Sequence, residues 1–171
     1  AFCPQCIRED TISFGFSFWR RSHQTDIKVC VKHNVVLQRY CPFCDMPFTR
    51  EGHGLEVMWN GCEGSSLATI TAVSNQDPVE YKRSKLLRDI YSFGYHVSEE
   101  AVLLLLHEKL SSMSHTGLFA SPTANMTIEL LNSTVLLMKE QKFNHHFESK
   151  FQGLIFEAIL LAYDSFSSFM S

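Results

Sequence analysis

The 171-residue sequence has no long apolar run, no excess of positive charge and no cysteine beyond residue 62. A membrane-spanning helix needs about 20 consecutive apolar residues, and no stretch of even about 18 is present, so no membrane segment is predicted. The formal net charge is −3, which disfavours non-specific DNA binding driven by total charge. A local basic patch is compatible with that balance.

Motifs for catalysis are also missing. No Walker loop, Ser-His-Asp order, H-E-x-x-H pattern or paired-carboxylate motif stands out. We therefore predict no catalytic residues and a protein that is not an enzyme.

The chain begins at Ala1, has no initiator Met or signal-peptide pattern, and reaches its first cysteine at position 3. We interpret it as a fragment of a longer polypeptide, in which N-terminal targeting signals would not be visible.

All six cysteines lie between residues 3 and 62. An even number of cysteines is compatible with disulfides in a secreted protein. Two C-x-x-C pairs and one C-x-x-H pair favour metal binding instead, because two ligands on one turn can hold the same ion. This interpretation predicts a reducing, cytoplasmic compartment.

The first predicted metal site consists of Cys3, Cys6, Cys30 and His33. Each pair has the same two-residue gap, and the 23 intervening residues can leave the ion and return. Structural zinc takes four Cys or His ligands in a tetrahedron. Because four protein ligands leave no open position for water, we predict a structural Zn2+ site rather than a catalytic one.

A second Zn2+ site is predicted around Cys41 and Cys44, with Cys62 as the third ligand. The fourth ligand is unsettled. His53 lies midway between Cys44 and Cys62 in a glycine-flanked turn and is the candidate. The alternative is that His53 is a solvated loop residue and that the second site is degenerate or empty.

The predicted fold class is mostly α, with a small zinc-stabilised, irregular and β-poor N-terminal module and a helical C-terminal domain. The module covers residues 1–64, whose core is small enough to need staples. Residues 65–77 form a polar connector, and the helical domain covers residues 78–171.

Capping residues and apolar periodicity predict four helices in that domain. The first begins at Pro78 after the N-cap Asp77 and ends near Gly94. The second is capped by Ser98 and reaches Met113, with an apolar centre at 102–106 that we expect to be buried on most faces. After a loop over 115–125, two more are expected near 126–142 and 148–169.

The segment between the two ligand pairs contains Phe18, Trp19, Arg20 and Arg21. We expect the two aromatic side chains to pack against the small zinc core. Arginine side chains can contact phosphates or read guanine, so Arg20 and Arg21 are candidates for nucleic-acid contact.

The densest basic run supplies further candidates for phosphate contact, Lys82, Arg83, Lys85 and Arg88. A helix, a Gly94 turn and a Ser98-capped second helix resemble a helix-turn-helix. The apolar and acidic character of the second helix favours a helical packing unit instead.

One stretch goes beyond generic zinc spacing and resembles the TniQ/TnsD family of bacterial transposition proteins. The residues that carry this resemblance are Cys3-Pro4-Gln5-Cys6, Asp10, Phe14-Gly15-Phe16-Ser17-Phe18, Trp19-Arg20-Arg21-Ser22-His23-Gln24, Val29-Cys30-Val31-Lys32-His33, Leu37 and Cys41-Pro42-Phe43-Cys44. The resemblance covers residues 2–44 well and the helical continuation weakly.

The resemblance implies a zinc finger on Cys3, Cys6, Cys30 and His33 and a role in choosing the insertion site of a Tn7-like element. Such proteins bind a DNA attachment site or dock on an RNA-guided CRISPR complex, and they recruit an AAA+ ATPase that activates the transposase. A bacterial, nucleoid-associated location follows. The alternative is a zinc-finger transcription regulator unrelated to transposition. The apolar C-terminal helices are compatible with internal packing or with a homodimer.

Overall fold

The computed structural model describes residues 1–23, 27–49, 52–54, 56–114, 121–140 and 148–171. These residues divide into two compact units, Ala1–Tyr91 and Ser92–Ser171. The chain is 58% helical, with seven helices and a two-stranded sheet among the described residues. The predicted fold class, mostly α with a β-poor N-terminal part, is confirmed.

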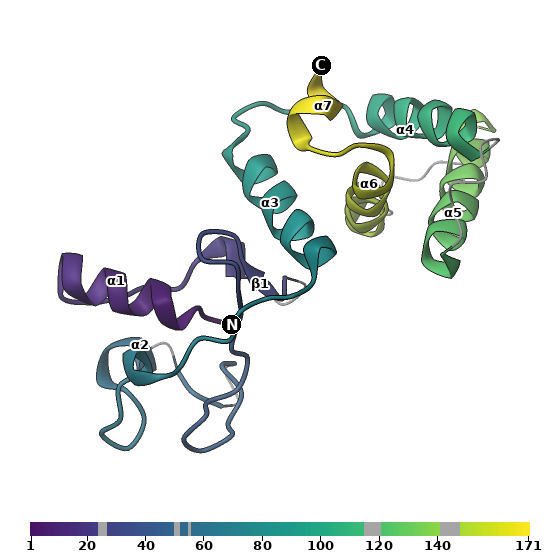
Figure 1. Ribbon diagram of the computed structural model, residues 1–171. Helices are drawn as coiled ribbons and strands as arrows, with labels where there is room; N and C mark the ends of the chain where they lie inside the picture. The colour runs from purple at the N-terminus through teal and green to yellow at the C-terminus, as the bar shows by residue number, and fades with distance from the viewer. Residues whose placement is uncertain (24–26, 50–51, 55, 115–120, 141–147) are drawn as a thin grey trace. The chain divides into compact units, whose positions relative to one another are not determined.

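Figure 1 shows the order of the elements. In the first unit they are α1 (Pro4–Phe14), η1 (Arg21–His23), β1 (Val29–Cys30), β2 (Val35–Val36), α2 (Val57–Asn60), η2 (Leu67–Thr69) and α3 (Pro78–Ser92). In the second unit they are α4 (Glu99–Ser114), α5 (Pro122–Lys139), α6 (Glu148–Ala162) and α7 (Phe166–Met170). The boundary between the units follows Tyr91, so α3 is grouped with the first unit, whereas the predicted helical domain begins at residue 78.

Helix α1 begins at a cysteine. Cys3 has the extended backbone of an N-cap, and its Sγ accepts a hydrogen bond from the backbone N–H of Cys6. Pro4 follows at the first helical position, where its missing N–H costs nothing. Gly15 ends the helix with φ of +79°, a left-handed conformation that glycine adopts without strain. Sequence patterning predicted only a tight turn here, because charged residues interrupt the apolar spacing.

Strands β1 and β2 form a short antiparallel hairpin in which Val29 pairs with Val36 and Cys30 with Val35. The chain reverses through a turn that ends at Asn34, whose N–H donates to the Cys30 carbonyl at 2.8 Å and whose φ is +51°. This turn places the third residue after Cys30 back beside its sulfur.

The first unit has a small apolar core. Phe2 and Phe48 meet edge to face, with ring centroids 4.9 Å apart. The buried members of the core are Phe2, Ile7, Cys41, Val57, Met58, Cys62 and Leu67. Two of these seven are cysteines, so this core includes sulfur atoms that a metal could bind.

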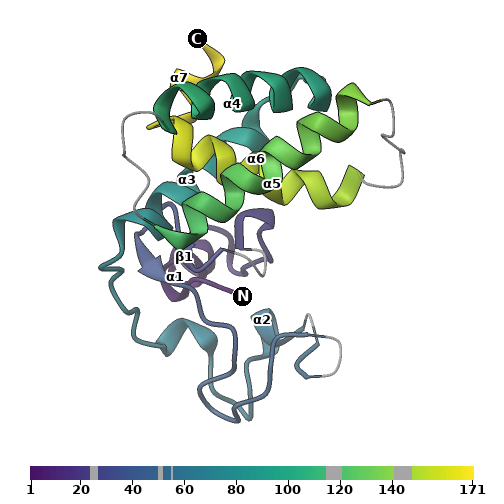
Figure 2. The same cartoon turned by 90° about the vertical axis from the view of Figure 1, so that its right-hand side faces the viewer.

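The second unit is built on α4, α5 and α6, which contact one another pairwise and lie side by side in both views (Figures 1 and 2). Leu103, Leu106 and Leu110 of α4 are fully buried, as is Leu131 of α5. The expectation that residues 102–106 are buried on most faces is wrong. Helix α4 turns one stripe to the core, so Leu104 and Leu105, 40% and 45% exposed, face away from it.

Two of the predicted helices, α3 and α4, agree with the structure. The carboxylate of Asp77 accepts from the N–H groups of Val79 and Glu80 at the start of α3, and the hydroxyl of Ser98 accepts from Ala101 at the start of α4.

The later boundaries differ. Helix α5 begins at Pro122, inside the expected loop, because proline suits a first helical turn. Residues 115–120 and 141–147 lie outside the described part. The expected single helix over 148–169 ends at Ala162 and restarts at Phe166, where Ser165 makes a capping box with Ser168. In the described part of the chain, no helix has the length and apolar character to cross a membrane.

Candidate metal centres

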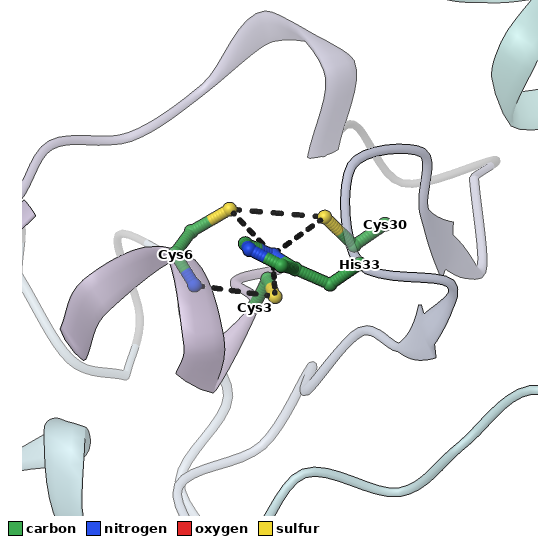
Figure 3. A group of neighbouring side chains, drawn as sticks. All are labelled: Cys3, Cys6, Cys30 and His33. Carbon is green, nitrogen blue, oxygen red and sulfur yellow. Dashed lines mark hydrogen bonds between the residues drawn. The ribbon is translucent and has the colours of Figure 1, made fainter. Parts of the chain in front are cut away.

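The first cluster joins the start of α1 to the β1–β2 hairpin. Cys3 and Cys6 occupy the N-cap and the first turn of α1, while Cys30 ends β1 and His33 lies in the following turn. Their side chains point toward one another (Figure 3). Local backbone hydrogen bonds shape both knuckles, from the N–H of Ile7 to the Cys3 carbonyl and from the N–H of Asn34 to the Cys30 carbonyl.

The distances within this cluster match a zinc tetrahedron. His33 Nδ1 lies 3.4 Å from the sulfurs of Cys3 and Cys6 and 3.7 Å from that of Cys30. The sulfurs of Cys6 and Cys30 are 3.7 Å apart. A zinc ion with Zn–S bonds of about 2.3 Å and Zn–N bonds of about 2.0 Å sets its ligand atoms roughly 3.5–3.8 Å apart. Three thiolates and one imidazole are also a usual donor set for structural zinc.

The pKa of Cys30 is shifted in the opposite direction from those of Cys3 and Cys6. Hydrogen bonds from Cys3, then Cys6, then the ring of the buried His23 hold the pKa of Cys30 well below its usual range. The pKa of Cys6 is raised, because Cys3 and Cys30 lie against its sulfur and burial disfavours a second thiolate. Since metal ligands must be deprotonated, metal binding here would release protons.

The second cluster gathers Cys41, Cys44, His53 and Cys62. Their ligand atoms all lie within 4.8 Å of one another, and Cys44 Sγ is 3.0 Å from His53 Nε2. Cys41 and Cys44 bracket a turn that ends at Asp45, whose φ is +58° and whose N–H donates to the Cys41 carbonyl. The residue that sequence spacing left unsettled, His53, is therefore brought to the other three.

Burial and hydrogen bonds from backbone N–H groups shift the pKa values of Cys62 and Cys41 in opposite directions. Burial, together with the neighbouring sulfurs of Cys44 and Cys41, raises the pKa of Cys62 to about 12. Burial also acts on Cys41, but N–H groups of Phe43 and Cys44 donate to its sulfur and bring its pKa below the usual value. A positive ion would remove the penalty on Cys62 by pairing its thiolate.

The TniQ family model matches residues 1–37. This segment contains the whole first cluster and ends before Cys41, and the match confirms the resemblance found in the sequence. No curated protein and no solved structure matches the chain. The match spans 37 of the 171 residues, and this likeness to TniQ suggests an association with Tn7-like transposition.

Within the TniQ-matching segment, Arg20 is engaged by the protein itself. Its guanidinium donates to Asp10 Oδ1 at 2.7 Å, and the Ser17 hydroxyl donates to Asp10 Oδ2 at 2.7 Å. Burial alone would raise the pKa of Asp10, but Arg20 and Ser17 bring it below its usual value. Arg20 therefore braces the loop after α1, and its contact with nucleic acid stays a prediction.

The aromatic residues beside Arg20 have different surroundings. Trp19 packs against the apolar core, with its ring centroid 5.8 Å from that of Phe48. Phe18 is 44% exposed and lies under the Arg20 guanidinium at 4.4 Å. The expected packing holds for Trp19 and is wrong for Phe18, because Asp10 holds Arg20 over its ring.

The basic candidates on α3 have varied surroundings. Lys85 is exposed and Lys82 is half-buried. Arg83 Nε lies 4.0 Å from Glu80 Oε2, and Arg88 Nη2 lies 2.8 Å from Asp89 Oδ1. Arg21, the candidate on η1, lies 6.0 Å from the ring of Tyr91 at the end of α3. Helices α3 and α4 belong to different units, so a helix-turn-helix stays a prediction.

Two residues lie next to the first cluster, His23, which the sequence indicated only as part of the family-like motif, and Glu9, which sequence reasoning missed. His23 is buried beside Cys30. Glu9 Oε1 is 2.9 Å from His33 Nε2. The helix would have indicated Glu9, since it lies three residues after Cys6 and side chains at that spacing share a helix face.

Proposed function

We propose that this chain is a zinc-stabilised target-selection adaptor of Tn7-like transposition. It binds a DNA attachment site or an RNA-guided CRISPR complex and recruits the AAA+ ATPase that activates the transposase. The observation that carries this proposal is the TniQ match over residues 1–37, which contains four metal-type ligands at zinc spacing. The proposed setting is the reducing cytoplasm of a bacterium, at the nucleoid.

Zinc has a structural role in this proposal. One ion is held by Cys3, Cys6, Cys30 and His33, and a second by Cys41, Cys44, His53 and Cys62. Four protein ligands leave no position for a reactive water, which supports a non-catalytic protein. The ions staple the module at residues 1–64 to a defined shape, because its apolar core is small.

The proposed nucleic-acid surface is the basic run on α3 together with Arg21. Lys82, Arg83, Lys85 and Arg88 give this helix four cations against Glu80 and Asp89. Lysine and arginine side chains bind the phosphate backbone without reading sequence. Lys28 Nζ lies 2.9 Å from Glu80 Oε1, so an ion pair connects the start of the β1–β2 hairpin to α3. This connection supports the proposal because it links the basic helix to the segment that contains the first cluster.

The second unit is the proposed protein-binding part of the domain at 78–171. Leu104 and Leu105 on α4 and Leu130, Leu136 and Leu137 on α5 are 40–59% exposed. Large contiguous apolar patches mark protein contacts, and we propose that these leucines contribute to one. We assign them to the ATPase or to a second copy of the chain in a homodimer.

A transposition assay tests the proposal. The double variant Cys30→Ser/His33→Ala is compared with wild type for site-specific insertion in cells that carry the cognate transposon. We expect loss of target-specific insertion together with loss of bound zinc. His96→Ala is the matched control, because it removes an exposed histidine outside both clusters and keeps insertion.

Retained targeting in the double variant would contradict the proposal. Binding to many promoters unrelated to an attachment site would favour a transcription regulator instead. Adding DNA or the CRISPR ribonucleoprotein separately to the purified chain identifies which target it binds.

A further inference from the structure

The carboxylate of Glu9 lies against the outer edge of the His33 ring. Glu9 Oε1 is 2.9 Å from His33 Nε2, while Nδ1 of the same ring faces the sulfurs of Cys3 and Cys6 at 3.4 Å. The two ring nitrogens therefore face different partners, an acidic oxygen on one side and thiol sulfurs on the other.

We infer that Glu9 positions His33 for metal binding through Nδ1. This inference rests on the proposal that the first cluster holds zinc. A carboxylate that accepts the Nε2–H hydrogen bond fixes the tautomer in which Nδ1 has a free lone pair. It also orients the ring and makes the ligating nitrogen more basic.

Lys32 completes the arrangement from the other side. Its ammonium group pairs with Glu9 Oε2, so the carboxylate is held at both oxygens. Lys32 precedes His33 in the hairpin turn, and Glu9 lies on α1 one turn after Cys6. The two interactions link the same elements that supply the four ligands.

The contribution of Glu9 comes from orientation more than from charge. The Glu9 side chain is 47% exposed and that of Lys32 is 62% exposed, so water screens their attraction. The His33 side chain is only 12% exposed, which leaves its ring few alternative partners. Removing an outer carboxylate of this kind typically weakens metal binding about 10- to 100-fold.

The alternative role for Glu9 is to tie the hairpin to α1 without acting on the histidine. In that case a Glu9 variant would lower the stability of the unit but leave the zinc dissociation constant and the His33 Nε2–H signal unchanged. The state of the ring nitrogens separates the two roles, because it reports the hydrogen bond at Nε2 directly.

The experiment uses the full chain loaded with zinc, as wild type, Glu9→Ala, Glu9→Gln and Lys32→Gln. Competition with a chromophoric chelator gives the zinc dissociation constants, and long-range 1H–15N NMR of the histidine rings gives the Nε2–H signal of zinc-bound His33, which reports its hydrogen bond to Glu9. Glu80→Gln is the matched control, because Glu80 also pairs with a lysine, Lys28, and belongs to neither cluster.

We expect Glu9→Ala to weaken one zinc-binding step about 10- to 100-fold and to shift the His33 Nε2–H signal. Glu9→Gln, which keeps a neutral acceptor, falls between Glu9→Ala and wild type, and Lys32→Gln has a smaller effect. Glu80→Gln changes neither readout. An unchanged dissociation constant and an unchanged His33 Nε2–H signal in Glu9→Ala would overturn the role of Glu9 while leaving the metal centre intact. Absence of zinc binding by wild type would overturn the metal centre and this inference with it.

Discussion

The two Cys/His clusters of the first unit offer the same donors, three thiols and one imidazole, but they hold the histidine differently. His33 lies in a β-turn, presents Nδ1 to the sulfurs and has Glu9 at its other nitrogen. His53 presents Nε2 to Cys44, and its ring stacks on Phe48 with centroids 5.8 Å apart. The His33 ring is therefore oriented by its hydrogen bond to Glu9, and the His53 ring by stacking on Phe48.

Ligand spacing also separates the clusters. In the first, two knuckles with equal gaps, Cys3–Cys6 and Cys30–His33, each fix a pair of ligands. In the second, only Cys41 and Cys44 form a knuckle, and the other two ligands come singly from later segments. Two single ligands need the whole chain between them to fold correctly, so the second site depends more on tertiary structure.

Burial gives the clusters unequal access to solvent. All three cysteines of the first cluster are buried, whereas Cys44 and His53 in the second are half-buried. A chelator or a competing ligand therefore reaches the second cluster more easily.

The largest expected effect follows from removing a first-cluster thiolate. Structural zinc in small zinc fingers contributes an apparent binding free energy of about 10–16 kcal/mol at neutral pH, and that energy drives folding. We expect Cys30→Ser to unfold the first unit while the α4–α6 bundle keeps its own signals, because its core contains leucines and no metal ligands. NMR amide dispersion and metal analysis measure this. A folded first unit with two bound metals would refute it.

The second prediction separates the clusters by stoichiometry. We expect Cys62→Ser to bind one zinc ion per chain instead of two, because the second cluster shares no ligand with the first. In wild type, a chelator should remove zinc in two phases, and Cys62→Ser should lack the faster one. Metal analysis and stopped-flow chelation provide the readouts. If Cys62→Ser lacks the slower phase instead, the chelator reaches the first cluster more easily than the second, and the prediction is wrong.

The third prediction concerns the ion pair between Asp10 and Arg20 in the loop after α1. We expect Asp10→Asn to lower the free energy of unfolding by about 1–3 kcal/mol at neutral pH, because it leaves Arg20 without its anion. The folded pKa of Asp10 lies below the unfolded value of about 3.9. Its contribution is therefore complete above that value and is lost as the pH falls through the folded pKa.

Denaturant unfolding of wild type and Asp10→Asn at several pH values measures this contribution. Their difference should stay constant from neutral pH to about pH 5 and shrink below about pH 4. Ser22→Ala, a change outside the ion pair, is the control. A difference that grew on acidification would show that Asp10 is not stabilised as a carboxylate.

The smallest expected effect tests the aromatic support of His53. Stacked aromatic pairs contribute about 0.5–1.5 kcal/mol beyond their buried area. We expect Phe48→Leu to weaken zinc binding at the second cluster by up to about tenfold and to leave the first unchanged. Chelator competition measures both constants. Equal weakening at both sites would mean that Phe48 acts through the shared apolar core, where it also contacts Phe2.

Sequence patterns located the first cluster because both of its pairs are local. The spacing of Cys3, Cys6, Cys30 and His33 could be recognised without any knowledge of the fold. His53 could not be assigned, since its approach to Cys44 depends on the path of the chain between the knuckle and Cys62. Glu9 was missed for a related reason, because the ligand that it touches, His33, is 24 residues away in the sequence.

Helix prediction succeeded for α3 and α4, where a polar cap precedes an apolar stripe, and failed for α1, where no such cap is present. Asp77 and Ser98 marked the starts of α3 and α4. Helix α1 is capped by a cysteine, which the usual preference for Ser, Thr, Asp and Asn does not include. Leu104 and Leu105 continued an apolar run that suggested burial, although a helix turns them away from the side that packs.

Because Cys3 caps α1 and Cys6 lies in its first turn, the number of residues between these two cysteines is restricted. Each residue advances an α-helix by about 100°, so an insertion between Cys3 and Cys6 would rotate the second thiol away from the hairpin. A surface loop accepts an extra residue at small entropic cost, whereas the Pro4–Gln5 dipeptide does not. Single-residue insertions and deletions should therefore be tolerated least at these two positions, even though neither side chain is a ligand.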